Sequence, residues 1–389
     1  SLTRVIRPSG PAMSSASLPA WVLDGRDGVH AVDGSFSPAK AANLPRSGLA
    51  VYKRQRFPDP LLGERFAPGE TVFENDGVRL WHDGDGVAVA SFKTKLHTVN
   101  DHVLNGLQEA IGIAERDFRG MVLWQPKEPF SAGADLSGAL GLLQTGDVKG
   151  FEAMVENFQA TSQRIKYSLV PVIGAVRGLA LGGGCEFQMH TALTVAHLES
   201  YIGLVEAGVG LLPAGGGLKE FAVRASQAAG SGGDVFAQLK PVFEAVAMAK
   251  VSASAIEAKE MGLLRQSDIV DFHPHELLHV ATQQAKALHE SGYRAPTRSP
   301  FPVAGRNAIA TIKAQLANMR DGGFISAHDF HISALIADVV CGGDVDAGSM
   351  VNEEYLMALE RKHFCALLDH PKSQERIMGM LQTGKPFRN

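Results

Sequence analysis

Cysteine is scarce in this chain of 389 residues, which has three, at Cys185, Cys341 and Cys365. They lack paired spacing, so neither a disulfide scaffold nor a zinc site of four such ligands can be built from them. We therefore expect a reducing, cytoplasmic location and no metal site. Long apolar runs are also missing, since the richest, residues 170–181, contains Arg177 and falls short of the roughly 20 residues that span a bilayer. We expect no membrane-spanning helix, and no basic-then-apolar signal peptide opens the sequence.

Charge of one sign is not in excess. Lys and Arg number 37 against 41 Asp and Glu, a formal net charge of −4, and no dense basic run occurs. A nucleic-acid-binding face or a membrane-surface patch is therefore not expected. Glycine is abundant, with 42 residues, which suggests tight turns and close backbone approaches. Apolar residues make up 45% of the chain, enough to bury a core.

The first seventy residues differ in composition from the rest. They hold eight of the nineteen prolines, and proline removes a backbone donor and breaks helices. We predict that residues 1–70 form an extended linker or wrapping segment. The sequence begins with Ser1 rather than methionine, so we expect a fragment of a longer protein.

From Val78 onward, strands are predicted to alternate with helices. Apolar patterns predict two strands joined by a turn, at 78–81 and 87–92. They also predict three separate strands, at 121–124, 171–176 and 193–196. Helical spacing is present between them at 103–114 and 151–166. This alternation indicates βαβ units with mainly parallel strands, an α/β fold. After Pro241 we predict almost only helices, at 256–264, 276–289, 307–319, 328–340 and 352–368.

Two small-residue segments follow predicted strands. Gly182 to Gly184 come after the strand that we expect to end near Val176, and a helix starts at once. Glycines let backbone N–H groups face a ligand, and a helix N-terminus favours negative charge. This is typical of an anion or oxyanion site, with a tight helix-to-sheet contact as the alternative. Residues 131–134 form the second segment, and Asp135 is placed to cap the next helix.

Two glutamates, Glu186 and Glu206, have apolar and glycine neighbours, with a helix and a strand predicted between them. Two carboxylates that face one cavity can perform general acid–base catalysis, because an apolar site moves carboxyl pKa values towards neutrality. Taken singly, each would instead be an exposed or salt-bridged glutamate.

Together these segments closely resemble the crotonases, the enoyl-CoA hydratase/isomerase family, from about Val78 to Leu264. Residues 213–217 and 258–263 are similar to the family's Pro-Gly-rich turn and its Ala-x-x-x-Gly-Leu segment. The C-terminal stretch looks most like the hydratase portion of bacterial bifunctional 3-hydroxyacyl-CoA dehydrogenase/enoyl-CoA hydratase chains, in which the dehydrogenase lies on the N-terminal side. The resemblance implies a crotonase core of ββα turns in a spiral at 71–270. A helical region for homo-oligomerisation or internal packing would follow at 271–389.

The resemblance also implies roles for individual residues. Backbone N–H groups of Ala132 and Gly183 would form the oxyanion hole for a thioester oxygen. Glu186 would deprotonate the attacking water, and Glu206 would protonate C2. The coenzyme A path would follow Lys95, Leu96, Ser131, Ala132, Ala134 and Asp135. The implied reaction is reversible syn-hydration of trans-2-enoyl-CoA to 3-hydroxyacyl-CoA in fatty-acid β-oxidation, with CoA carried by the substrate and neither a separate cofactor nor a metal.

The sequence departs from the family pattern near the site. Leu204-Val205 precede Glu206 where Gln-Pro or Leu-Pro is usual, while Ala192 and Ala214 replace an aspartate and a glycine. These departures leave the acyl-chain preference open. Two other functions also stay open. One is Δ3-to-Δ2 enoyl-CoA isomerisation, for which one carboxylate can suffice, and the other is a non-catalytic scaffold whose late helices hold a partner.

Overall fold

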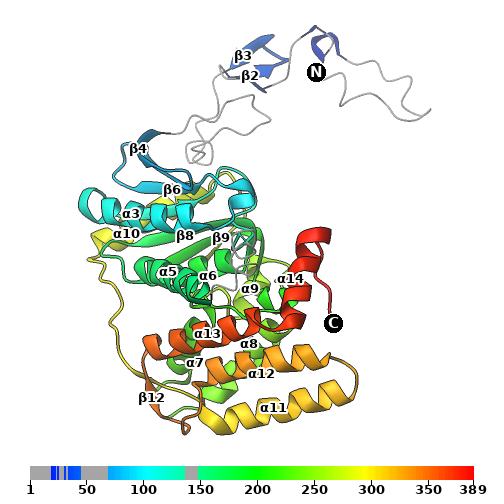
Figure 1. The fold of residues 1–389 in the computed structure, drawn as a ribbon. Coiled ribbons are helices and arrows are strands. Elements are labelled where there is room, and N and C mark those ends of the chain that lie inside the picture. The colour runs from blue at the N-terminus through cyan, green and yellow to red at the C-terminus, as the bar shows by residue number, and fades with distance from the viewer. Residues whose placement is uncertain (1–18, 23, 26–29, 32–33, 45–68, 136–147) are drawn as a thin grey trace, which may run out of the picture. The chain divides into compact units, whose positions relative to one another are not determined.

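The computed structural model describes residues 19–22, 24–25, 30–31, 34–44, 69–135 and 148–389, and contacts divide the chain into the units Ser1–Pro68 and Gly69–Asn389 (Figure 1). The first unit contains a small antiparallel sheet of order β1 (His30–Ala31), β2 (Gly34–Ser37) and β3 (Ala42–Leu44). It also has a 3-10 turn, η2 (Ala20–Val22), in which the Trp21 ring lies 5.8 Å from the ring of Phe36. The proline-rich composition predicted an extended linker or wrapping segment over residues 1–70, and the strands of this small sheet were not predicted.

A seven-stranded sheet forms the centre of the second unit, in the order β10-β9-β8-β7-β6-β5-β4. Neighbouring strands from β6 to β10 are parallel, whereas β4, β5 and β6 pair antiparallel. The strands are β4 (Glu70–Glu74), β5 (Val78–His82), β6 (Ala88–Phe92), β7 (Met121–Trp124), β8 (Val172–Leu181), β9 (Leu193–Gly203) and β10 (Ile269–Asp271). The prediction of an α/β fold with mainly parallel strands is confirmed.

Helices connect these strands and cover the sheet. After the 3-10 turn η4 (Lys95–His97), helix α3 (Asp101–Asp117) begins at Asn100, whose side chain accepts a hydrogen bond from the N–H of Val103. Helix α10 (Leu277–Glu290) packs against β7, β8 and β9. All four residues of β7 are buried, which is expected of a strand covered on both faces. The remaining connections are α5 (Val148–Lys166), α6 (Gly183–His190) and the 3-10 turn η5 (Glu206–Val209).

Most of the later chain is helical, as predicted. Its helices are α7 (Gly217–Ala229), α8 (Val235–Ala247), α9 (Ala255–Glu260), α11 (Gly305–Asp321), α12 (Ala327–Cys341), α13 (Glu353–Leu368) and α14 (Pro371–Thr383), and two short strands pair as β11 (Phe301–Pro302) and β12 (Met350–Val351). Helix α13 packs against α5, α7 and α12, and α14 packs against η5. The late helices therefore lie on the core of their own chain (Figure 1). No helix in the described ranges is both long enough and apolar enough to cross a membrane.

Strands β8 and β9 both run further than their apolar patterns predict, to Leu181 and to Gly203. The expected end of β8 near Val176 is wrong, because the strand continues to Leu181. Its register with β9 is irregular between Val176 and Gly178, and Gly178 has a φ of +68°. The Arg177-Gly178 pair interrupts the apolar run and so hides the extension. As a result, β8 and β9 reach the Gly182 turn together, where the N–H of Gly182 donates to the carbonyl of Gly203 at 2.9 Å.

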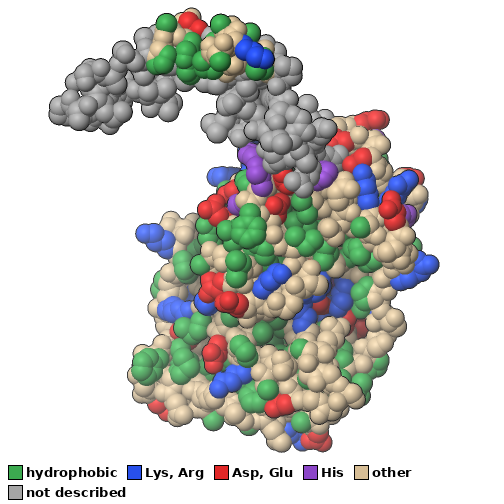
Figure 2. Space-filling view, turned by 180° about the vertical axis from the view of Figure 1, so that it is seen from behind, with side chains coloured by type: hydrophobic (Ala, Val, Ile, Leu, Met, Phe, Trp, Pro, Cys, Tyr) green, Lys and Arg blue, Asp and Glu red, His purple; other side chains and the backbone are tan. Residues whose placement is uncertain are grey.

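Acidic and basic side chains are interspersed over the face drawn in Figure 2, in keeping with the small net charge. Large apolar side chains that are well exposed come from separate places in the chain, such as Phe324, Leu169 and Phe272. Single apolar residues of this kind are normal on a protein surface.

Candidate functional site

A cavity of about 290 Å³ lies where the small-residue loops and both predicted glutamates converge. Its polar side is formed by residues that the sequence had singled out, Ala132, Ala134, Asp135, Gly183, Glu186 and Glu206. Its apolar side comes largely from helices, with Leu104 of α3, Met154, Val155 and Phe158 of α5, Phe364 and Leu368 of α13, and Ile377 and Met380 of α14. Segments far apart in the sequence therefore form one chamber with a polar and an apolar side.

Glu186 lies in the first turn of α6 with its side chain almost fully buried. Its Oε1 accepts hydrogen bonds from the backbone N–H groups of Gly215, at 2.7 Å, and Gly217, at 2.9 Å. Burial raises the pKa of Glu186 to about 7, although the two N–H donors oppose this rise. The carboxyl group is therefore close to half-ionised at neutral pH, which suits proton transfer.

Glu206 begins η5, after the end of β9. Burial raises its pKa well above the ordinary value, and the negative charge of Glu186 raises it further. Its Oε2 has no hydrogen-bond partner among the described residues. A Cβ at Gly182 would lie 2.9 Å from Oε1 of Glu206, so a glycine in this turn lets the carboxylate approach. Burial and the neighbouring charge therefore favour the protonated form of Glu206.

The glycines at the start of α6 serve packing as well as backbone exposure. A Cβ at Gly183 would lie 2.4 Å from Cζ of Phe158, and one at Gly184 would lie 2.5 Å from Cβ of Ser131. The tight contact that was the alternative explanation for this motif is thus present. Close packing and backbone exposure therefore occur in the same turn. Phe158, which packs against the start of α6, also lines the cavity.

The amide groups differ from the prediction at one position. The N–H of Ala132 donates to the carbonyl of Leu96 at 3.1 Å, so it is already used in holding the loop. By contrast, the N–H groups of Ala134 and Gly183 have no acceptor among the described residues, and both residues line the cavity. Ala134 therefore replaces Ala132 as the candidate partner of Gly183. The small-residue pattern could not separate them, because the hydrogen bond from Ala132 to Leu96 joins two segments that a local pattern does not relate.

The other predicted binding residues are divided between the cavity and its surroundings. Asp135 lines the cavity, but the helix that it was expected to cap falls in residues 136–147, outside the described residues. Ser131 is fully buried, and its hydroxyl donates to the carbonyl of His97 at 2.7 Å, so it supports the loop. Lys95 and Leu96 are exposed on η4 and do not line the cavity.

A buried polar cluster behind Glu186 was not predicted from the sequence. Lys219 is fully buried, and its Nζ lies 3.1 Å from Oε2 of Glu220, 2.9 Å from Oε2 of Glu353 and 2.8 Å from Nε2 of His190. Opposite charges lower the pKa of Glu220 and of Glu353, although burial acts against this. The cluster joins α13 to the start of α7.

Another carboxyl group, Glu360, is fully buried near the same helix start. Glu353 and Glu360 are seven residues apart, so they fall on one face of α13, the face that also carries the buried Leu356 and Leu367. Two acids on an apolar helix face were the signal that could have identified them, because burial of a carboxylate requires partners.

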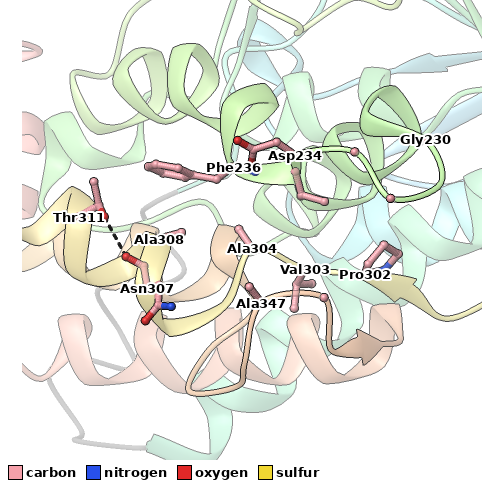
Figure 3. A pocket seen from close by; sticks show the side chains of 14 residues that line it. Gly230, Asp234, Phe236, Pro302, Val303, Ala304, Asn307, Ala308, Thr311 and Ala347 are labelled. Atoms are coloured by element: carbon pink, nitrogen blue, oxygen red, sulfur yellow. Dashed lines mark hydrogen bonds between the residues drawn. The ribbon is translucent and has the colours of Figure 1, made fainter.

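A larger cavity, of about 620 Å³, lies elsewhere in the second unit, beside the start of α8 and α11 (Figure 3). The only titratable residue that lines it is Asp234, whose carboxylate caps α8 by accepting from the N–H groups of Phe236 and Ala237. Thr311, drawn in Figure 3, bonds to the carbonyl of Asn307 in its own helix. This larger cavity therefore offers no pair of titratable side chains for acid–base chemistry. Among the described residues, no group of three His, Cys, Asp or Glu side chains is placed to hold a metal ion.

Comparison with known proteins places this geometry in a family. Residues 83–295 match the family model described as enoyl-CoA hydratase/isomerase. A probable 3-hydroxyacyl-CoA dehydrogenase of Bacillus subtilis is 37% identical over 82% of this chain and 40% of its own length. A putative fatty acid oxidation complex trifunctional enzyme of Rickettsia felis is 27% identical over 91% of this chain and 46% of its own length. The chain thus spans less than half the length of these relatives.

Solved structures agree with the fold. A putative enoyl-CoA hydratase from Streptomyces avermitilis matches with a TM-score of 0.53 and 18% identity, over 80% of this chain and 93% of that one. An enoyl-CoA hydratase from Bacillus halodurans matches with a TM-score of 0.51 and 14% identity, over 80% of this chain and all of that one. With the family match covering more than half of the sequence, the chain belongs to the enoyl-CoA hydratase/isomerase family and has the crotonase fold.

Proposed function

We propose that this chain catalyses the reversible addition of water to a 2-enoyl-CoA thioester, giving a 3-hydroxyacyl-CoA. The observation that carries the proposal is the convergence of Glu186, Glu206 and the N–H groups of Ala134 and Gly183 on one cavity. The two amides bind the thioester oxygen and stabilise the negative charge that develops there. Each such donor contributes ~2.7–4 kcal/mol in enzymes where one has been removed.

The two carboxyl groups take different roles because their surroundings differ. Glu186, with a pKa of about 7, provides enough carboxylate at neutral pH to remove a proton from water. Glu206, whose pKa is raised further by the charge of Glu186, provides the proton. Pairs of carboxyl groups with separated pKa values commonly divide acid and base roles in this way.

The step balances in atoms and charge. The water oxygen forms a bond to C3 as Glu186 takes one of its protons, and the C2–C3 double bond opens towards the thioester carbonyl. Glu206 then gives its proton to C2 as the carbonyl re-forms. The product contains one added water, and the reverse sequence removes it.

Coenzyme A recognition is part of the same proposal. Lys95, exposed on η4 next to the loop that lines the cavity, binds a phosphate of the nucleotide. The apolar side of the cavity, which includes Phe158 and Met380, takes the acyl chain. This arrangement supports a thioester with a charged and an apolar end.

The test follows loss of enoyl-thioester absorbance with crotonyl-CoA for the wild type, Glu186→Gln and Glu206→Gln. Glu199→Gln, a neutralised exposed glutamate on β9, is the matched control. We expect a loss of activity of at least about 100-fold in each site variant and none in the control. Full activity in either site variant contradicts the assigned roles.

The alternatives give distinguishable results. With a 3-enoyl-CoA substrate, gain of conjugated absorbance without later hydration identifies an isomerase. Absence of CoA-thioester binding at millimolar ligand in calorimetry supports a non-catalytic scaffold instead. Adding a separate 3-hydroxyacyl-CoA dehydrogenase and NAD⁺ detects the hydration product as NADH.

We also propose that this chain works beside a dehydrogenase that oxidises its product. The support is that one relative is named a probable 3-hydroxyacyl-CoA dehydrogenase and that the chain covers 40% of its length. If this is so, an extended chain that includes the rest of the relative's length forms NADH from crotonyl-CoA and NAD⁺ unaided. Formation of the hydroxyacyl product alone by that chain would contradict it.

A further inference from the structure

Glu360 of α13 is a carboxyl group without a role in the reaction proposed above. Its side chain is fully buried. Oε2 accepts hydrogen bonds from the N–H of Gly216, at 2.9 Å, and from Nε2 of Gln159, at 3.1 Å, while Oε1 accepts from the N–H of Lys219 at 2.8 Å. Three donors bind its two oxygens, and they favour the carboxylate and so oppose the effect of burial.

Glu360 and Glu186 hold the same turn. Glu186 binds the N–H groups of Gly215 and Gly217, and Glu360 binds those of Gly216 and Lys219. The two carboxyl groups therefore alternate on successive free amides at the start of α7. These are the amides that a helix leaves unsatisfied and that favour negative charge.

The turn has no cap of its own. Gly216, the N-cap residue of α7, has a φ of +101° and no side chain that could accept from the helix. A Cβ at Gly215 would lie 2.4 Å from Oε2 of Glu186, which shows how closely the turn fits that carboxylate. Loss of Glu360 would leave two buried N–H groups without an acceptor, which costs free energy of folding. The turn would move to find other partners for them.

From this arrangement we propose that Glu360 is a positioning residue, which fixes the turn whose N–H groups bind Glu186. This inference rests on the proposed hydratase function. It assigns to the late helix α13 an effect on the acid–base chemistry, although Glu360 does not line the cavity.

The charges around Glu360 come from every element that packs near it. Lys219 on α7 is the nearest buried cation and favours the carboxylate, whereas Glu186 on α6 disfavours it. Its charge in turn raises the pKa of Glu206 on η5. On α5, Gln159 is a donor to Glu360 and accepts from Arg361, and Lys166 is bound by carboxylates of Glu220 and Glu353.

Two histidines also lie near this helix. His190 on α6 stays neutral, because burial lowers its pKa to about 3. His363 on α13 is paired with Asp338 of α12 at 2.7 Å.

Burial and the charge of Glu186 raise the pKa of Glu360 to about 8, in spite of its donors. Glu360 thus ionises after Glu186, and it acts on Glu186 through the turn. The N–H groups of Gly215 and Gly217 lower the pKa of Glu186, so a turn that is no longer held by Glu360 binds the Glu186 carboxylate less well. The acid limb of kcat/KM then moves to higher pH, by on the order of one pH unit.

The experiment compares pH profiles of kcat/KM with crotonyl-CoA for the wild type, Glu360→Gln, Glu360→Asp and Glu353→Gln. We expect Glu360→Gln to lose activity and to shift the acid limb upwards. Glu360→Asp keeps two acceptor oxygens for the amides of the turn and should keep the limb in place. Glu353→Gln removes a carboxylate one heptad earlier on α13 that contacts the Nζ of Lys219 and not an amide of the turn, and it should alter stability without moving the limb.

A second readout does not depend on turnover or on one variant. Carboxyl ¹³C NMR follows ionisation of Glu186, assigned by difference from Glu186→Gln. Gln159→Leu, which removes one donor to Glu360, should shift it in the same direction as Glu360→Gln. An unchanged Glu186 titration in both variants overturns the inference. A wild type that is inactive but shows these shifts overturns the proposed function alone.

Discussion

Replacing Lys219 by methionine is expected to destabilise the protein strongly. The side chain keeps its length but loses a buried ammonium that contacts Glu220, Glu353 and His190. Lys166, at 2.8 Å from each carboxylate, is then the remaining cation of the cluster for both. Removing one partner from a buried ion pair costs about 3–5 kcal/mol, because a charge is left uncompensated in a poorly solvated place.

Urea unfolding at pH 7 measures this loss, with Lys250→Met as the control. Lys250 pairs with Glu257 at 2.7 Å, but the two side chains are 52% and 29% exposed, and such surface pairs contribute at most about 1 kcal/mol. In a double-mutant cycle, Glu353→Gln should cost less in the Lys219→Met background than in the wild type.

The pH dependence of the same experiment has a definite sign. The pKa values of Glu220 and Glu353 are lowered in the folded protein, so these groups stabilise it above their unfolded pKa and lose that contribution as the pH falls. The difference between wild type and Lys219→Met should therefore narrow below about pH 4.5. A loss under about 1 kcal/mol at pH 7, equal to that of Lys250→Met, would refute the reasoning.

Three further results are expected. The kcat/KM profile should rise through about pH 7 as Glu186 ionises and fall as Glu206 loses its proton, and a flat profile would contradict these roles. Glu206→Gln should raise Tm at pH 8 but not at pH 4, because a carboxyl pKa that is raised on folding opposes folding as the pH rises above the unfolded value; thermal unfolding at both pH values checks this, and a lowered Tm at pH 8 is the contrary result. Gly183→Ala should cost about 1–3 kcal/mol in urea unfolding and lower kcat, since its Cβ would lie 2.4 Å from the ring of Phe158, whereas Gly112→Ala meets only a side-chain atom at 3.8 Å and should cost nothing.

The sequence predicted those elements whose apolar spacing is regular. The strands at Val78 and Met121 are short apolar runs next to turns, and the helix from Asp101 carries helically spaced apolar residues, so local patterns predict all three. It missed the second half of β8, where Arg177 and Gly178 interrupt the pattern but pairing with β9 continues. Pairing between strands is a long-range property that a local window does not contain.

The site was predictable to the extent that local motifs carry it. Glu186, Glu206 and Gly183 stand in segments with their own signals, and all three line the cavity. The choice between Ala132 and Ala134 depends on a hydrogen bond to Leu96, which lies on another segment. Glu360 was missed for a similar reason, because its partners belong to α5 and α7.

The apolar side of the cavity has a consequence for how activity arises during synthesis. Strands and loops that carry both glutamates leave the ribosome long before α13 and α14, which supply Phe364, Leu368, Ile377 and Met380. Until those helices dock, the carboxyl groups would be exposed to solvent, and their pKa values would stay ordinary. A nascent or partly unfolded chain would thus hold every acid and amide of the site and still be inert towards thioesters.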